Sequence, residues 1–399
     1  MSALAEAPAR RRVTAKHVGW TGIVLALLAA FITLPPLTLR TPFVSIVLAL
    51  AAVGVGIYAT RDGEKRLGWI AIVLGVLAGA GAVAATESGE SSLDAVFVWS
   101  ALAAAMLRFA TPLVFAALGG LICERSGVIN IGLEGMMLMG AFFGIFGSDL
   151  TGSWLLGCFV GMAAGGLLAL LHAIFSISFR ADQVVSGTAV NLLAFGITGY
   201  VFIAHYGSEG TPGDVPRVPE LTLPLIEDVG FFGEAIGSAS LLTWVALLLV
   251  PLATLYLFRT PSGLRLRSVG EKPRASDTVG IPVLRTRYFA VVASGMFAAL
   301  GGVYLSIALL GSFNEMMTAG RGFIALAAVI FGAWRPVGAL IAALLFGFSS
   351  ALAQRLPEFS ESTAVLFQAL PYVLTLIVVA GVIGRSRPPA SIGIPYVKE

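Results

Sequence analysis

Residues 123–140, CERSGVINIGLEGMMLMG, place ionisable and amide side chains between two strongly apolar stretches. The side chains that could do chemistry there are Glu124, Arg125, Asn130 and Glu134. The two carboxylates could form a catalytic or ion-binding pair. Alternatively, Glu124 and Arg125 could be solvated in an ordinary cytoplasmic turn while Asn130 caps the next helix. In a third interpretation, the polar groups pair inside a bundle where a helix is broken.

The sequence lacks the motifs of common hydrolytic chemistry. A Walker A phosphate loop needs a Gly-Lys pair, and none of the four lysines follows a glycine. None of the three histidines precedes a glutamate, which excludes an HExxH zinc site, and GxSxG is absent as well. Two cysteines are too few for a disulfide scaffold or a metal site. We therefore expect this chain by itself to be no enzyme and to hold no metal or cofactor.

The elements that must position these side chains are membrane helices. Of the 399 residues, 57% are hydrophobic and 12% are charged, whereas a soluble domain has roughly 25% charged residues. The sequence therefore predicts an all-α polytopic membrane protein. About twelve apolar windows are long enough to span a bilayer: 19–35, 42–59, 67–85, 95–121, 133–149, 154–178, 184–205, 241–258, 288–311, 320–333, 337–356 and 364–384. We interpret the first as a retained span, because no convincing signal-peptide cleavage site follows it.

The distribution of charge between the loops predicts the orientation. Basic residues concentrate in the N-terminal tail, in RDGEKR at 61–66, in the 259–287 loop and after residue 384. The 207–240 loop holds six acidic residues and one arginine. With twelve spans, both termini and the 259–287 loop are expected to be cytoplasmic, and the acidic loop is expected to face outward.

The hexamer FAALGG occurs twice, at 115–120 and 297–302. LEGMM follows the first copy, and NEMM follows the second. Each copy lies in the first of four spans, spans 4–7 and spans 9–12, and the parity of the spans gives the copies opposite directions. The pattern predicts an inverted repeat of two four-span halves, which in transporters accompanies broken or re-entrant helices.

The polar stretch follows a segment whose helix could end inside the membrane. Counted from Arg108, the apolar run 109–122 has 14 residues, roughly 21 Å of helix against a hydrocarbon core of roughly 30 Å. Either the helix reaches back through Arg108 toward residue 95, or it breaks before crossing. Breakers and cap formers come next. A new helix is then expected near Asn130 with Glu134 in its first turns, where a carboxylate suits the helix dipole.

ERSGVINIGLEGMMLMGA, at 124–141, resembles the signature of inner-membrane permease subunits of ABC importers in the ribose and branched-chain amino-acid permease superfamily. Within that group the chain is most similar to the nucleoside or "simple sugar" permeases that work with basic-membrane-protein-type binding lipoproteins. Three further stretches match the family: 263–288, 311–340 and 370–381. The resemblance covers about 95–395 and leaves the first 94 residues outside.

This resemblance and the spans together give an expected domain organisation. An N-terminal cytoplasmic tail and three extra spans occupy 1–94, and an ABC permease domain occupies 95–395. The parts of the permease domain are a first half 95–206, an outward loop 207–240, a linking span 241–258, a coupling loop 259–287 and a second half 288–384.

The resemblance assigns the 263–288 loop to coupling with a separate ATPase, through a short helix that docks in a groove of that partner. Such a helix could begin at Ala275, Pro273 would fix its entry, and Gly270 and Gly280 would let the chain turn at each end. An ordinary positive-inside loop is the alternative. The residues expected to carry the coupling are Arg265, Arg267, Gly270, Glu271, Pro273, Arg274, Ala275, Asp277 and Gly280.

Polar side chains within apolar spans are candidates for a substrate path, because their burial is costly. Amides would suit a neutral hydroxylated substrate, and Phe195 and Phe313 could stack on a base. Glu315 and Arg321 could instead form a structural pair near the outer mouth, and His172 is interpreted as a satisfied helix-face histidine rather than a proton relay. The path candidates are Asn130, Glu134, Gln183, Asn191, Phe195, Phe313, Asn314, Glu315 and Arg321.

The resemblance implies a permease subunit of an ATP-driven nucleoside importer in the bacterial cytoplasmic (inner) membrane. It implies a second, heteromeric permease subunit, ATP-binding cassette subunits that bind ATP and Mg, and an extracytoplasmic substrate-binding lipoprotein, with membrane lipid but no nucleic acid as a further partner. The same machine for ribose-like sugars or branched-chain amino acids is an alternative. An ion-coupled secondary transporter, with Glu134 or Glu315 as its carboxylate, is a rival of another class.

Overall fold

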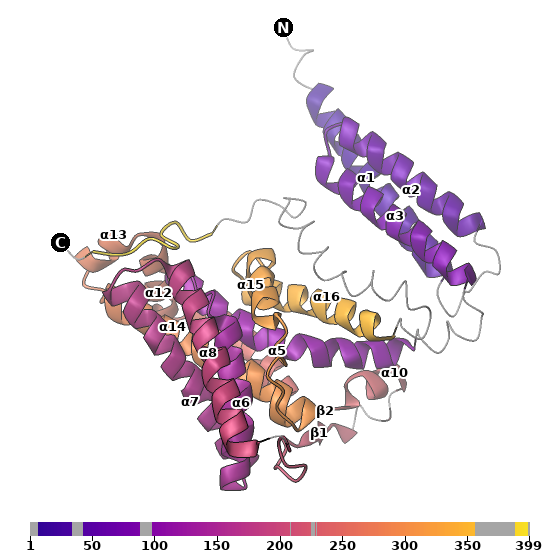
Figure 1. Cartoon of the computed structure of the whole chain (residues 1–399). Helices are drawn as coiled ribbons and strands as arrows, with labels where there is room; N and C mark the ends of the chain where they lie inside the picture. The colour runs from indigo at the N-terminus through magenta and orange to yellow at the C-terminus, as the bar shows by residue number, and fades with distance from the viewer. Residues whose placement is uncertain are drawn as a thin grey trace. The chain divides into compact units, whose positions relative to one another are not determined.

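The computed structural model describes residues 7–33, 43–87, 98–207, 209–224, 228, 230–355 and 388–397. The chain divides into two compact units (Figure 1). One comprises Met1–Trp99 with Leu352–Arg385, and the other comprises Ser100–Ala351 with Ser386–Glu399. Nearly all regular structure in the described residues is helical, as predicted.

The first unit contains a bundle of three helices: α1 (Ala7–Thr33), α2 (Phe43–Arg61) and α3 (Lys65–Glu87). Small residues let the helices approach closely, since a Cβ added at Gly22 of α1 would lie 2.8 Å from the Cβ of Ala71 in α3. Large apolar side chains are exposed instead, among them Trp20, Phe43 and Trp69. Small residues inside and large apolar residues outside are typical of helices that have lipid as their solvent.

The second unit carries the long helices α5 (Trp99–Arg125), α6 (Leu133–Thr151), α7 (Trp154–Ala173), α8 (Gln183–Tyr206), α11 (Leu241–Arg259), α14 (Val283–Val303) and α16 (Pro336–Arg355). Its short helices are α10 (Gly230–Phe232), α12 (Pro261–Glu271), α13 (Pro273–Thr278) and α15 (Arg321–Phe331). The π-helical turns are η1 (Ile174–Ser178), η2 (Gly233–Gly237) and η3 (Tyr304–Leu310), and the strands are β1 (Glu220–Thr222) and β2 (Ser238–Ser240).

Nine helices of the described residues are long and apolar enough to span a membrane, and each coincides with a predicted window. The apolar part of α1, Lys16–Ile32, is shorter. α5 runs unbroken through Arg108, so the helix does reach back before that residue. The predicted span at 320–333 is wrong, because the 11 residues of α15 make roughly 17 Å of helix, too short to cross. The predicted span at 364–384 lies outside the described residues.

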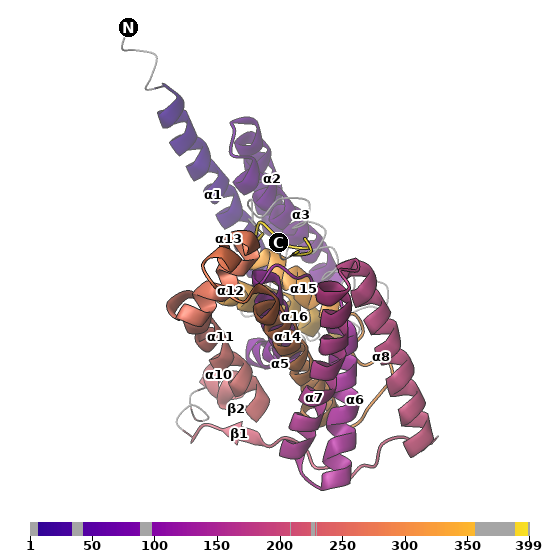
Figure 2. The ribbon, with the colours of Figure 1, turned by 90° about the vertical axis from the view of Figure 1, so that its left-hand side faces the viewer.

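Glycines allow α6, α7 and α14 to pack closely around one another, and Figure 2 shows α6, α7 and α8 side by side. A Cβ added at Gly140 would collide with the backbone of Ala299, and one added at Gly144 would lie 2.9 Å from the side chain of Val303. Gly161 of α7 meets the same valine, at 2.5 Å. The glycines therefore bring the backbone of each helix against the backbone or a small side chain of its neighbour, which fixes the spacing of the three helices.

The two FAALGG copies pack against each other reciprocally. A Cβ added at Gly119, the fifth residue of the first copy, would lie 3.0 Å from the Cβ of Phe297, the first residue of the second copy. A Cβ added at Gly301, the fifth residue of the second copy, would lie 3.4 Å from the Cβ of Phe115, the first residue of the first copy. The fifth residue of each copy therefore lies against the first residue of the other copy. Two equivalent segments contact each other in this reciprocal way when a twofold axis relates them.

The predicted outward loop 207–240 contains a two-stranded antiparallel sheet, β1 paired with β2. Several hydrogen bonds tie the loop to the rest of the second unit, two of them to residues of α6 and η3. Ser148 Oγ donates to the carbonyl of Pro216 at 2.7 Å, and the Val218 amide donates to the carbonyl of Ile307 at 3.1 Å. The nine spans found in the described residues are helical as predicted, and this small sheet is a feature that hydropathy did not predict.

Candidate functional site

The turn between α5 and α6, residues 126–132, is non-helical and mostly buried. Ser126 and Asn130 are fully buried, and Glu124, at the end of α5, is 3% exposed. The interpretation as a solvated turn is therefore wrong for Glu124. Asn130 does not cap α6 either, because the N-cap residue is Gly132 and no side chain caps it. The polar groups pair inside the bundle, as the third interpretation proposed.

Glu124 and Arg125 are both held by Trp334, which lies between α15 and α16. The indole Nε1 of Trp334 donates to Glu124 Oε2 at 2.5 Å. Arg125 Nε and Nη2 donate to the Trp334 carbonyl at 3.0 and 2.6 Å. Trp334 has a φ of 54°, a left-handed conformation that is rare for a large residue. The last residues of α5 are therefore fixed by a single strained residue of the second half.

Side chains of α7 and α8 satisfy the backbone of the turn. Gln183 Oε1 accepts a hydrogen bond from the Ile129 amide at 2.7 Å. His172 Nε2 lies 3.1 Å from the Ile129 carbonyl, and its Nδ1 lies 3.0 Å from Ser186 Oγ. His172 is a satisfied histidine, as the sequence favoured. Buried non-helical backbone needs partners of this kind, because it lacks the hydrogen bonds of a helix.

Two more of the predicted path amides serve the same turn. Asn191 Nδ2 donates to the Ile131 carbonyl at 3.0 Å, and its Oδ1 accepts from the Gly135 amide at 2.8 Å. Asn130 Nδ2 donates to Ser294 Oγ of α14 at 3.0 Å. These amides hold the backbone of the turn in place, so structural pairing occupies groups that the sequence offered as substrate ligands.

Glu134 lies in the first turn of α6, as predicted, but its carboxylate points at a different helix. Its Oε1 accepts from the Gly320 amide at 2.8 Å, and its Oε2 accepts from the Gly322 amide at 2.6 Å. These amides belong to the start of α15, where unpaired N–H groups and the helix dipole favour an anion. Gly322 permits the approach, since a Cβ there would lie 2.5 Å from the Glu134 nitrogen.

A second irregular segment, residues 311–320, joins η3 to α15. The glycines at its two ends have φ values of 69° and 80°. Phe313 is 5% exposed, and its ring lies 5.1 Å from that of Phe142 and 5.2 Å from that of Phe202. This aromatic packing fills the space in which a base would stack on Phe313. The Arg321 guanidinium folds back onto two carbonyls of the segment at 2.8 and 3.2 Å.

Three other path candidates lie on an open side of the second unit. Phe195 of α8 is 45% exposed, and Asn314 is exposed. Glu315 is half-buried, and a Cβ added at Gly199 would lie 3.8 Å from its Oε1. Phe195 and Gly199 share a face of α8 because they are four residues apart. The structure thus brings Phe195 and Glu315 to one side of α8, while Asn130 and Gln183 are buried.

The predicted coupling loop 259–287 contains two helices, α12 and α13, rather than one. Thr260 caps α12, because its Oγ1 accepts from the Gly263 amide at 3.1 Å. Pro273 occupies the start of α13, and Gly280 has a φ of 85° after its end, both as predicted. The exposed members of the predicted set are Arg265, Glu271, Arg274, Ala275 and Gly280, the half-buried ones are Arg267, Pro273 and Asp277, and Gly270 is buried.

The prediction for Gly270 is wrong. It lies inside α12 and makes no turn. A Cβ added there would collide with the carbonyl oxygen of Arg125 and would lie 3.2 Å from the Gly127 nitrogen. Gly270 is required because α12 touches the backbone that ends α5, which joins the coupling helices directly to the buried turn.

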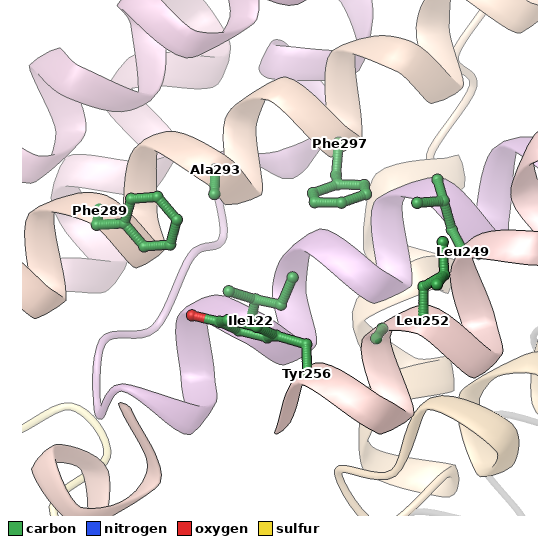
Figure 3. A pocket seen from close by; sticks show the side chains of 8 residues that line it. Ile122, Leu249, Leu252, Tyr256, Phe289, Ala293 and Phe297 are labelled. Carbon is green, nitrogen blue, oxygen red and sulfur yellow. The ribbon is translucent and has the colours of Figure 1, made fainter. Parts of the chain in front are cut away.

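Two shallow grooves are apolar. One, of about 310 Å³, lies beside α12 and α13 and is lined in part by Ala275, Val279 and Ile281. The other, of about 240 Å³, lies between α5, α11 and α14, where Tyr256 and Phe297 line it (Figure 3). A site for a polar small molecule needs convergent polar groups, and the groove in Figure 3 has almost none. It suits lipid chains or an apolar protein surface instead.

Sequence reasoning missed Trp334 and Arg287. Trp334 stands in the stretch 311–340, which resembles the family, and the signal that could have found it is an indole N–H donor at the end of an apolar window. Arg287 falls within the loop that the sequence predicts at 259–287, but it lies in the second turn of α14 and is 1% exposed. A basic residue followed at once by a long apolar run can belong to the helix rather than to the loop.

Comparison with known proteins gives consistent relatives. The guanosine ABC transporter permease protein NupQ of Bacillus subtilis (strain 168) is 44% identical over 322 residues, which cover 77% of this chain and 99% of the relative. The nucleoside ABC transporter permease protein NupC of Lactococcus lactis subsp. cremoris is 38% identical over 309 residues, 75% of this chain and 97% of the relative. A putative glucose ABC transporter permease protein of Haloferax volcanii is 40% identical over 255 residues, 63% of this chain and 76% of the relative.

Bacillus subtilis and Lactococcus lactis each have a second, more distant match. These are the permease proteins NupP of Bacillus subtilis, at 27% identity, and NupB of Lactococcus lactis, at 24% identity. No solved structure matches the chain. The family described as "Branched-chain amino acid transport system / permease component" matches residues 102–379, the stretch that contains the buried turn, the coupling helices and α15. The chain belongs to this family of membrane transport permeases.

Proposed function

We propose that this chain is the permease subunit of an ATP-driven nucleoside importer. The observation that carries the proposal is 44% identity along 99% of a guanosine permease. The geometry supports it, because the coupling helices, the buried turn and α15 form one connected system of close contacts. Such a system suits a subunit that converts the motion of a separate motor into the opening of a path.

In our proposal, the substrate path runs along the open face of α8 and the segment 311–320. Phe195, Asn314 and Glu315 lie on this side, where an aromatic ring, an amide and a carboxylate could contact a base and a ribose. Asn130, Gln183 and Asn191 shape the path indirectly, by holding the turn. A second, similar permease subunit would close the open side, and the occurrence of paired permease names in two bacteria supports a heteromeric pair.

The remaining partners follow from the proposed machine. ATP-binding cassette subunits would bind ATP and Mg and dock on α12 and α13, whose exposed Arg265, Glu271 and Arg274 offer charged contacts. An extracytoplasmic lipoprotein would deliver substrate to the opposite end. The chain would lie in the bacterial inner membrane with both termini cytoplasmic. This places the 207–240 loop on the side of the lipoprotein.

We also propose that the permease domain consists of two inverted halves. The reciprocal packing of the FAALGG copies supports a pseudo-twofold relation between α5 and α14. The two irregular segments, 126–132 and 311–320, follow these helices in turn. Inverted halves with broken helices near the axis are the arrangement by which many transporters alternate access.

An ion-coupled transporter fits the geometry less well. Its main carboxylate would be Glu134, yet both oxygens of Glu134 already accept backbone hydrogen bonds from the start of α15. A carboxylate used in this way is a helix cap rather than a site for a cation.

The deciding experiment is uptake of radiolabelled guanosine, uridine, inosine, ribose and glucose in cells with and without the gene. Each measurement is repeated after ATP depletion with the ion gradient maintained. Gene-dependent nucleoside uptake that stops with ATP depletion is the expected result. Uptake of glucose or ribose alone would support an ATP-driven importer with a different substrate. Uptake that survives ATP depletion would refute the proposal.

A further inference from the structure

The C-terminal segment 390–397, which we name the strap, lies against α12, α13 and α14 in the second unit (Figure 1). It has no regular secondary structure. An exposed polar tail would be expected to lie free at the end of a chain. This one is instead fixed by hydrogen bonds to three separate elements, and only the bond to Glu271 involves a residue of the proposed docking surface.

The first contact is with the end of α12. The Ser391 amide donates to the Gly270 carbonyl at 2.9 Å, and Ser391 Oγ donates to the same oxygen at 2.6 Å. The Ala390 amide donates to Glu271 Oε2 at 3.2 Å. The carbonyls at the end of a helix lack intrahelical partners, so Ser391 acts as a cap supplied from more than a hundred residues away.

The second contact is with the buried turn. The Gly393 amide donates to the Gly127 carbonyl at 3.0 Å. Gly127 and Gly393 have φ values of 89° and 75°. Added Cβ atoms would lie 2.8 Å from Ser391 Oγ and 3.0 Å from Ile129 Cδ1, respectively. Glycine is therefore needed on both sides of this contact.

The third contact is with α14. Arg287 Nη1 donates to the Ile394 carbonyl at 3.0 Å, while Nε and Nη2 of Arg287 have no hydrogen-bond partner in the described residues. Tyr396 packs with Val269 and Val283 in a buried apolar cluster. A buried guanidinium with one partner depends strongly on that partner, and here the partner is the strap.

We propose that the strap is a positioning element that fastens the coupling helices to the turn 126–132. When α12 and α13 are displaced, the turn 126–132 is then expected to move with them. Glu134, just after the turn, would pass this movement on to the start of α15. The positioning residues are Ser391, Gly393 and Arg287. This inference rests on the proposed function for its transport consequence, but the fastening itself can be measured without transport.

The fastening is tested by labelling in membranes. Ser126→Cys is introduced into the full chain after Cys123 and Cys158 are replaced by serine, and inverted vesicles are treated with a membrane-impermeant maleimide. Ser126 is fully buried, so the intact chain is expected to react slowly. A chain that ends at Arg387 is expected to react about tenfold faster, in line with a coupling free energy of ordinary size. Equal protection in both chains would overturn the proposal.

The transport consequence is tested in the assembled transporter. Gly393→Ala keeps the chain length and strains the second contact, so ATP-dependent uptake is expected to fall about tenfold while ATP hydrolysis and the amount in the membrane are retained. Ile394→Ala is the matched control, because Ile394 contacts Arg287 through its carbonyl and its side chain is 56% exposed. Equal uptake by the two variants would refute the coupling role.

The two proposals fail in different ways. If the intact chain with its partners transports no nucleoside, the proposed function is wrong, and the labelling result still decides whether the strap fastens the turn. If the intact chain transports and Gly393→Ala transports equally well, only the strap is refuted. Should the chain ending at Arg387 be absent from the membrane, Gly393→Ala in the labelled background replaces it, with the same expected direction.

Discussion

The contact of Glu134 with the start of α15 offers the sharpest test of the buried architecture. Both carboxylate oxygens accept backbone hydrogen bonds, at 2.8 and 2.6 Å, from residues 186 and 188 positions away. In Glu134→Gln, the side-chain oxygen still accepts one of these two hydrogen bonds. The NH2 group, a donor, then faces the other backbone N–H, so the second hydrogen bond is lost. The negative charge at the N-terminus of α15 is lost as well.

The magnitude follows from these two losses. A hydrogen bond to a charged group contributes about 1.5–3 kcal/mol, and a carboxylate at a helix N-terminus contributes about 0.3–1 kcal/mol. We expect Glu134→Gln to weaken the docking of α15 by about 2–4 kcal/mol. Thermal unfolding in detergent should begin at a lower temperature, and uptake should fall by about tenfold or more.

Two further variants make the test specific. Gly322→Ala places a methyl group 2.5 Å from the Glu134 nitrogen and should reproduce the effect without changing the charge. Glu209→Gln removes a carboxylate from an exposed position of the 207–240 loop and should leave the unfolding temperature unchanged. If Glu134→Gln matches the wild type in both unfolding and uptake, the cap contributes nothing and our reasoning about α15 is wrong.

Five other substitutions test the buried contacts and separate structural from path residues. Trp334→Phe removes the indole donor from a buried carboxylate and should destabilise the chain by about 1–3 kcal/mol; an unchanged unfolding temperature would contradict this. Gly302→Ala, which would collide with the backbone of α6, should cost about 1–3 kcal/mol, whereas Gly54→Ala, with nothing within 4 Å, should be neutral or slightly stabilising. Phe313→Ala should lower the free energy of unfolding by about 3–5 kcal/mol. Phe195→Ala should raise the KM for nucleoside uptake with little change in the unfolding temperature. If the two variants had equal effects on unfolding and on KM, the proposed path would be refuted.

Much of the fold could be predicted because a bilayer imposes length and hydropathy on every helix that crosses it. The position of the break after α5 was also predictable, since SGVIN is unsuited to an apolar helix. α15 could not be recognised as short, because its apolar window continues beyond Phe331 into a turn where Ala333 and Trp334 adopt left-handed φ values. Hydropathy carries no information about backbone conformation.

The sequence predicted which residues form the site, but not which residues they contact. The polar residues of the turn were identified as unusual, and their burial was one of the three interpretations. Their partners could not be identified, because Trp334 and Ser294 lie more than 160 residues away in the sequence. The sequence predicts a turn at Gly270 because glycine is common in turns. In the structure, glycine is needed there because α12 approaches the backbone of Arg125 closely. That second role of glycine cannot be recognised without knowing which residue lies opposite.

The three-helix bundle α1–α3 has a consequence for how the chain is threaded during synthesis. The family match begins at residue 102, and NupQ is covered to 99% by an alignment that leaves about a quarter of this chain unused. An odd number of added crossings inverts the side on which a chain starts. If α1, α2 and α3 all cross the membrane, as the sequence predicts, and α12 and α13 are cytoplasmic, as we propose, this chain also begins in the cytoplasm, where the basic run at 10–12 favours its retention. A permease of the same orientation without these helices would have to export its first residues.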